Sequence, residues 1–167
     1  VMCAMINFRA GDHYVSDPQK WETAHIMEHM SLGANKKYPK SKQLTAEIEK
    51  NGAYTNAQTA LADMIYTMEC ADFEWQRVLD LMCVGISQPL FLEEEFKSEY
   101  GNVHEEMLYR GNNHGWHLSI EMEKLFGLNV RTFQDRLALM PNVTVEDVRD
   151  HYVRTHYAEN MRFVIAG

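Results

Sequence analysis

The sequence is poor in basic residues and has no long hydrophobic run. Lys and Arg number 16 against 24 Asp and Glu, for a formal net charge of −8 and a pI near 5.4. Binding to nucleic acid needs clustered Lys and Arg against the phosphates, so this balance argues against a nucleic-acid partner. No apolar stretch approaches the roughly 20 residues of a membrane-spanning helix, so we expect no membrane span.

Cysteine is equally scarce. The three cysteines, Cys3, Cys70 and Cys83, are odd in number and form no C-x-x-C motif. Their apolar surroundings predict buried free thiols rather than a disulfide framework or a zinc site. Free thiols favour the cytoplasm or another reducing compartment.

No linker rich in proline or glycine divides the 167 residues, of which 46% are hydrophobic. The length and composition therefore predict one domain with one core. Because the chain starts in a strand-like run without an initiator Met, we expect it to be a fragment of a longer protein.

Hydrophobic periodicity predicts an α+β fold, with an antiparallel-rich sheet packed on several helices. The expected strands cover 1–9, 53–58 and 62–70, with a strand-like end at 163–167, and the expected helices cover 18–32, 42–51, 74–87, 92–110, 114–126 and 145–157. Asp17 before Pro18 is typical of a helix N-terminus, and Thr144 with Asp147 is an N-cap pattern. In 62–70, apolar residues alternate with others, which places one face of that strand on the core.

The most informative stretch is His25-Ile26-Met27-Glu28-His29. On an α-helix, residues three and four positions apart share a face, so the two imidazoles and the carboxylate can reach one point. The order H-x-x-E-H is the signature of the inverzincin metallopeptidases. It predicts that one metal ion binds His25 and His29.

The expected helix 92–110 carries two further acidic residues of interest. Glu99 and Glu106 lie at the edge of its apolar face. A carboxylate at such an edge is costly to desolvate without a cation, so a metal at Glu106 supported by Glu99 explains both positions. The alternative is that both side chains reach solvent.

These residues resemble the insulinase and mitochondrial-processing-peptidase family (pitrilysin-like), in which H-x-x-E-H is followed much later by a third ligand, a Glu. Glu106 stands 77 positions after His29 (106 − 29), and Glu99 precedes it by seven, as in the family's E-x6-E helix. Two further segments, Asn56-Ala57-Gln58-Thr59 and Gln88-Pro89-Leu90-Phe91, are similar to family patterns.

The resemblance implies a zinc-dependent endopeptidase. His25, His29 and Glu106 would bind one zinc ion and leave a fourth position for water, as catalytic zinc requires. Glu28 would act as the general base, and Glu99 would support the ligands through hydrogen bonding.

The resemblance also implies the substrate class, peptides, and how they bind. We expect an extended peptide to add to a sheet edge at 53–59, with Asn56 and Ala57 as substrate-binding residues. Family members consist of repeated α/β domains, each larger than this chain. We therefore expect 1–167 to be a single truncated catalytic domain, whose missing C-terminal half or partner subunit completes the site.

The chain departs from the family at Glu22-Thr23-Ala24, where G-x-A is usual, and at Ser31-Leu32-Gly33-Ala34. We expect these differences to affect the pocket wall rather than the ligands or the base. Two alternatives stay open. One is a non-catalytic peptidase-like subunit or peptide-binding scaffold, although such members usually lose H-x-x-E-H. The other is a helical binding module in which the motif is coincidental.

Overall fold

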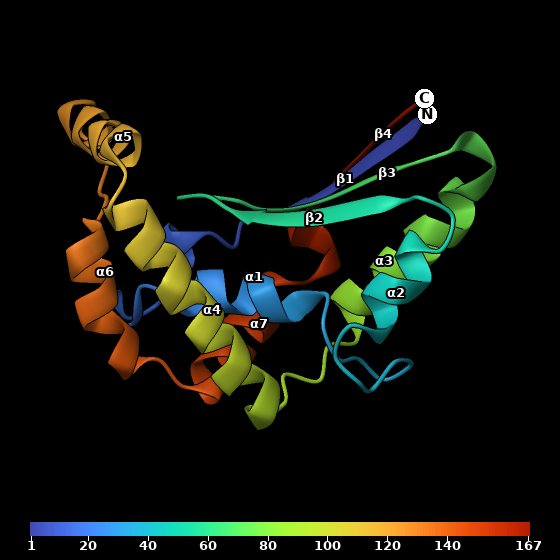
Figure 1. Cartoon of the computed structure of the whole chain (residues 1–167), viewed down its shortest axis with the longest axis horizontal. Helices are drawn as coiled ribbons and strands as arrows, with labels where there is room; N and C mark the ends of the chain where they lie inside the picture. The colour runs from blue at the N-terminus through green and yellow to red at the C-terminus, as the bar shows by residue number, and fades with distance from the viewer.

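The computed structural model describes all 167 residues as one antiparallel sheet with most of the helices on one of its faces and one helix standing apart beyond an end of the sheet (Figure 1). The strands are β1 (Met2–Phe8), β2 (Tyr54–Thr59), β3 (Met64–Cys70) and β4 (Met161–Ala166). Their order is β2-β3-β1-β4, and every neighbouring pair is antiparallel. The predicted α+β class is confirmed.

Seven α-helices accompany the sheet. They are α1 (Thr23–Ser31), α2 (Gln43–Glu49), α3 (Trp75–Ser87), α4 (Glu93–Gly111), α5 (His114–Leu125), α6 (Phe133–Leu139) and α7 (Val145–Thr155). In Figure 1, α1 and α7 lie beneath the middle of the sheet, α2 and α3 beneath one end, and α4 beneath the other, with α6 beside α4 beyond that end and α5 above α6. None of the helices combines the length and the apolar character that crossing a membrane requires.

The core lies between the sheet and the central helices. Met64, Tyr66 and Met68 of β3 are fully buried, as the alternation in 62–70 predicted. They pack in one cluster with Ile26 and Met27 of α1. Because α1 is wedged into this core, its remaining face, which carries the H-x-x-E-H residues, is held rigidly against β2 and α4.

Two helix predictions were wrong. The expected helix 18–32 begins only at Thr23, because Pro18–Lys20 forms a separate 3-10 turn in which Asp17 accepts a hydrogen bond from the backbone N–H of Gln19. Helix α6 was not expected at all. It has only seven residues, too few to produce a clear hydrophobic period, and a capping box at Thr132 and Asp135 starts it.

The prediction for the cysteines holds in part. All three are free thiols, and Cys70 is buried, but Cys3 and Cys83 are exposed. Strand alternation explains Cys3, because Ala4 next to it faces the core and Cys3 therefore points to the open face of the sheet.

Candidate metal centre

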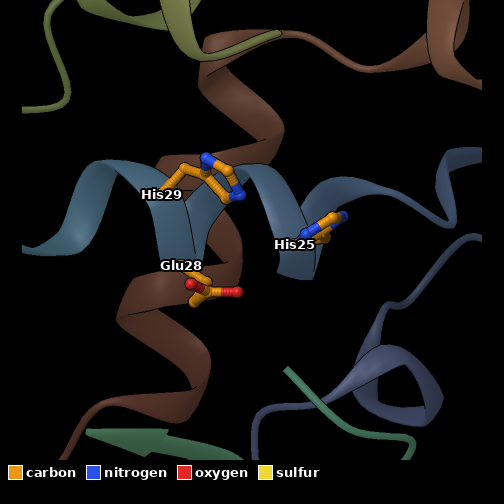
Figure 2. Close-up of side chains that lie close together, drawn as sticks. All are labelled: His25, Glu28 and His29. Atoms are coloured by element: carbon orange, nitrogen blue, oxygen red, sulfur yellow. The ribbon is translucent and has the colours of Figure 1, made fainter. Parts of the chain in front are cut away.

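Helix α1 brings three potential ligands together. The side chains of His25, Glu28 and His29 leave the helix close to one another (Figure 2), and one donor atom from each lies within 4.8 Å of the others. His25 is buried, whereas Glu28 and His29 are half-buried. The cluster is thus anchored in the core and open to solvent on one side.

Helix α4 adds Glu106 to this cluster. The Glu106 Oε2 atom lies 3.5 Å from His25 Nε2 and 3.4 Å from His29 Nε2. Ligands bound to zinc at about 2.0–2.2 Å in a tetrahedron are separated by roughly 3.3–3.5 Å, so both distances match edges of such a tetrahedron. Two imidazole nitrogens and a carboxylate oxygen are also a donor set typical of zinc. The residues therefore fit the ion.

The second ring nitrogen of each histidine contacts another carboxylate. His29 Nδ1 lies 3.3 Å from Glu99 Oε2, and His25 Nδ1 lies 3.1 Å from Glu22 Oε2. Because a carboxylate accepts, each Nδ1 carries the proton and donates it. With Nδ1 occupied in this way, each Nε2 is the nitrogen that faces Glu106.

The ionisation of the cluster reflects this crowding of imidazoles and carboxylates. Hydrogen bonds from His25 and His29 hold the pKa of Glu106 well below its usual range. Burial lowers the pKa of His29, but hydrogen bonds to Glu106 and Glu99 outweigh burial and raise it to about 9. Burial likewise lowers the pKa of His25, and hydrogen bonds to Glu106 and Glu22 raise it overall. The cluster favours positive charge at its centre.

Glu28 points to a different neighbour. Its Oε2 atom accepts a hydrogen bond from the Thr59 hydroxyl of β2 at 3.2 Å. A cavity of about 520 Å³ separates the helix side from β2 here. Its lining includes the candidate ligands and residues of β2: His25, Glu28, His29, Asn56, Ala57, Gln58, Thr59, Glu106, Arg110 and Trp116. The structure therefore brings every residue singled out from the sequence to one cavity or, for Glu99, into contact with a residue lining it.

Two residues at the centre were missed from the sequence. Arg110, one turn after Glu106, forms an ion pair with the carboxylate of Glu106 and stacks over the ring of Trp116 at 4.8 Å. Glu22 had been counted among the departures that leave the ligands untouched, and that expectation was wrong because Glu22 contacts His25 directly. The i, i+3 spacing of Glu22 and His25 was the available signal.

Comparison with known proteins places these residues in a wider context. The family model "Insulinase (Peptidase family M16)" matches residues 7–122. The chain is 25% identical over 162 residues to Protease 3 of Escherichia coli (strain K12), covering 90% of this chain and 16% of that protein. It is 27% identical over 172 residues to the probable zinc protease PqqL of Haemophilus influenzae, covering 95% of this chain and 18% of that protein.

The fold is similar to a solved structure as well. The crystal structure of pitrilysin superposes with a TM-score of 0.80 at 21% sequence identity, over 99% of this chain and 18% of that one. The chain thus spans less than a fifth of the length of these relatives.

Proposed function

The chain belongs to the insulinase family of peptidases, family M16, and we propose that it forms the zinc-binding part of an active site that hydrolyses peptide bonds. The observation that supports this most strongly is the position of Glu106 Oε2, 3.5 Å and 3.4 Å from the two histidine Nε2 atoms. Both separations suit neighbouring ligands of one tetrahedral ion, and three protein ligands would leave a fourth position free for water.

In this proposal His25, His29 and Glu106 hold the zinc. When bound, zinc polarises the scissile carbonyl and lowers the pKa of a bound water. Magnesium and calcium prefer oxygen ligands in larger number, so two imidazoles favour zinc over either. Glu99 orients His29 through its hydrogen bond to Nδ1.

Glu28 takes the part of the general base. The hydrogen bond from Thr59 turns its carboxylate toward the cavity in front of β2, where a substrate peptide has room. From that position Glu28 can accept a proton from the attacking water and transfer it to the leaving amine.

The proposed substrate is an extended peptide. Strand β2 has a neighbour on one side only, so its other edge offers unpaired backbone groups to a further strand. Asn56 and Ala57 of β2 line the cavity that holds the metal cluster. A peptide paired with this edge would therefore pass its backbone in front of Glu28.

In this proposal the active enzyme includes more than this chain. Because the relatives are more than five times as long, we propose that residues beyond these 167, or a partner subunit, enclose the substrate from the open side of the cavity. The alternative of a non-catalytic scaffold is not favoured, because the chain keeps the H-x-x-E-H motif together with Glu106.

Zinc stoichiometry of purified variants tests the assignment. We expect about one zinc per wild-type chain by elemental analysis, the same for Glu28→Gln, and a loss of zinc for Glu106→Gln, because only Glu106 is a ligand in this proposal. Glu105→Gln, an exposed neighbour on the same helix, is the matched control and should retain zinc.

The opposite result, with zinc lost in Glu28→Gln and kept in Glu106→Gln, would exchange the roles of the two carboxylates. In a longer protein that contains this domain, Glu28→Gln should retain zinc and lose peptide cleavage. Cleavage at the wild-type rate in that variant would overturn Glu28 as the base.

A further inference from the structure

Glu22 is a fully buried carboxylate at the start of the motif helix. It occupies the N-cap position of α1, yet its side chain makes no capping hydrogen bond to the helix. Its side chain is 0% exposed. Removing a carboxylate from water costs free energy. A carboxylate is therefore buried only where charged or hydrogen-bonding partners replace the lost hydration.

Those partners come from two elements far apart in the sequence. Arg136 of α6, 114 positions away, donates from Nε to Glu22 Oε1 and from Nη2 to Oε2, the latter at 2.9 Å. His25 Nδ1 donates to the same Oε2 at 3.1 Å. The fork of two parallel bonds from a guanidinium fixes the plane of a carboxylate, so the direction in which Oε2 faces His25 is fixed too.

From this geometry we propose that Glu22, held by Arg136, is a positioning residue for the metal centre. It sets the His25 ring so that Nδ1 keeps its proton and Nε2 faces Glu106. This inference rests on the proposed zinc site. It also extends that site to α6, which lies outside the residues 7–122 that match the family model.

His25 and His29 each have a carboxylate partner, but the partner of His25 is held more firmly than the partner of His29. Glu99, the partner of His29, is 20% exposed in its side chain and contacts His29 at 3.3 Å. Glu22 is buried completely and contacts His25 more closely, through a carboxylate that is itself clamped. We therefore expect the loss of Glu22 to loosen its histidine at least as much as the loss of Glu99 loosens His29.

The test measures zinc affinity of the 167-residue chain by competition with a chromophoric chelator. Glu22→Gln alone leaves the guanidinium of Arg136 buried without its carboxylate and endangers the fold, so Glu22→Gln/Arg136→Met removes both charges together. Glu99→Gln serves as the comparison. Lys20→Met is the matched control, because it breaks an ion pair between separate elements, Lys20 to Asp147, that includes neither a proposed ligand nor a partner of one.

Three readouts separate positioning from stability. Thermal unfolding in the presence of EDTA reports the fold without metal. The visible absorption of the Co²⁺-loaded chain reports the ligand geometry, and ¹⁵N NMR of the imidazoles reports which nitrogen of His25 carries the proton. A residue that serves only the fold would change the first and leave the other two unaltered.

We expect the double variant to bind zinc about 10 to 100-fold more weakly than wild type, with an altered Co²⁺ spectrum and a mixture of His25 tautomers, while Lys20→Met binds as wild type. Wild-type affinity and spectrum in a folded double variant would overturn the role of Glu22 and leave the zinc site standing. A wild-type chain that binds no zinc would overturn the proposed site and this inference with it.

Discussion

At the residue scale, His156 serves the core, in contrast to the two histidines that we propose as metal ligands. Its ring stacks on Phe8 and Tyr152, with centroids 4.3 Å and 5.0 Å apart. Its Nε2 atom accepts a hydrogen bond from the Tyr66 hydroxyl at 2.9 Å. Burial in these apolar surroundings lowers the pKa of His156 to about 3, so the ring is neutral in the folded chain.

This burial predicts a pH-dependent stability. Between the unfolded pKa of about 6.5 and the folded pKa of about 3, the unfolded chain binds a proton that the folded chain does not, so stability falls as the pH falls. Urea unfolding of the metal-free chain should show a contribution from His156 that decreases by about 2 kcal/mol from pH 7 to pH 5.

The contribution of His156 is the difference in the free energy of unfolding between wild type and His156→Gln at each pH. His25 and His29 have raised pKa values, so their contribution has the opposite sign and is greatest at low pH. It is common to both chains and cancels in the comparison. Parallel pH profiles for wild type and His156→Gln would show that His156 is protonated in the folded state.

At the scale of elements, α7 packs against α1, the helix that carries the H-x-x-E-H residues. Its N-terminus has a capping box, in which the Thr144 hydroxyl accepts from the Asp147 backbone and the Asp147 carboxylate accepts from the Thr144 backbone. Helices α7 and α1 pack directly on each other. Helix α7 therefore helps to hold α1 in place in the core.

The capping box predicts different effects for two substitutions of Thr144. Thr144→Ala removes the hydroxyl acceptor and should lower the free energy of unfolding by about 1 kcal/mol, measured by urea denaturation. Thr144→Ser keeps the hydroxyl and should stay close to wild type. Zinc stoichiometry should be unchanged in both, because the cap touches no ligand. Equal losses in the Ala and Ser variants would assign the effect to the methyl group instead of the cap.

At the scale of the whole molecule, the candidate metal site lies beside β2, at one edge of the sheet. Most helices lie on one face of the sheet (Figure 1), and the cavity with the candidate ligands is lined by residues of α1, β2 and α4. At the opposite edge, β4 is exposed along its whole length, including Phe163, which pairs with the buried Ile6 of β1. The candidate substrate edge and the exposed β4 edge are therefore on opposite sides of the sheet.

This arrangement predicts that zinc stabilises the whole chain. The proposed ligands lie on α1 and α4, which meet only in the folded state, so we expect zinc to bind the folded chain in preference to the unfolded one. At free zinc 100 times the dissociation constant, the free energy of unfolding should rise by about 2.7 kcal/mol, with a higher melting temperature that EDTA reverses.

Magnesium at the same concentration is the control and should leave the melting temperature unchanged. Glu106→Gln should abolish most of the zinc effect. A zinc effect of undiminished size in that variant would place the ion on other ligands.

The sequence alone determined the features that depend on local periodicity. The alternation in 62–70 predicted a strand with one buried face, and the spacing of His25, Glu28 and His29 predicted a shared helical face, because a regular element orients its side chains by residue number alone. The pair Glu99 and Glu106 was recognised through its distance from the motif. The roles of these two residues stay predictions, whereas the structure shows that the carboxylates of both contact His29.

Only the tertiary structure decided which residues distant in sequence contact the residues that the motif identified. Nothing local marks Arg136 as the partner of Glu22, since 114 positions separate them and the short helix α6 has no clear period. The same holds for Thr59 and Glu28, which meet because β2 packs against α1. Spacing in sequence orients side chains within one element, but contacts between elements depend on how the core packs, and that packing decided which carboxylate holds each histidine.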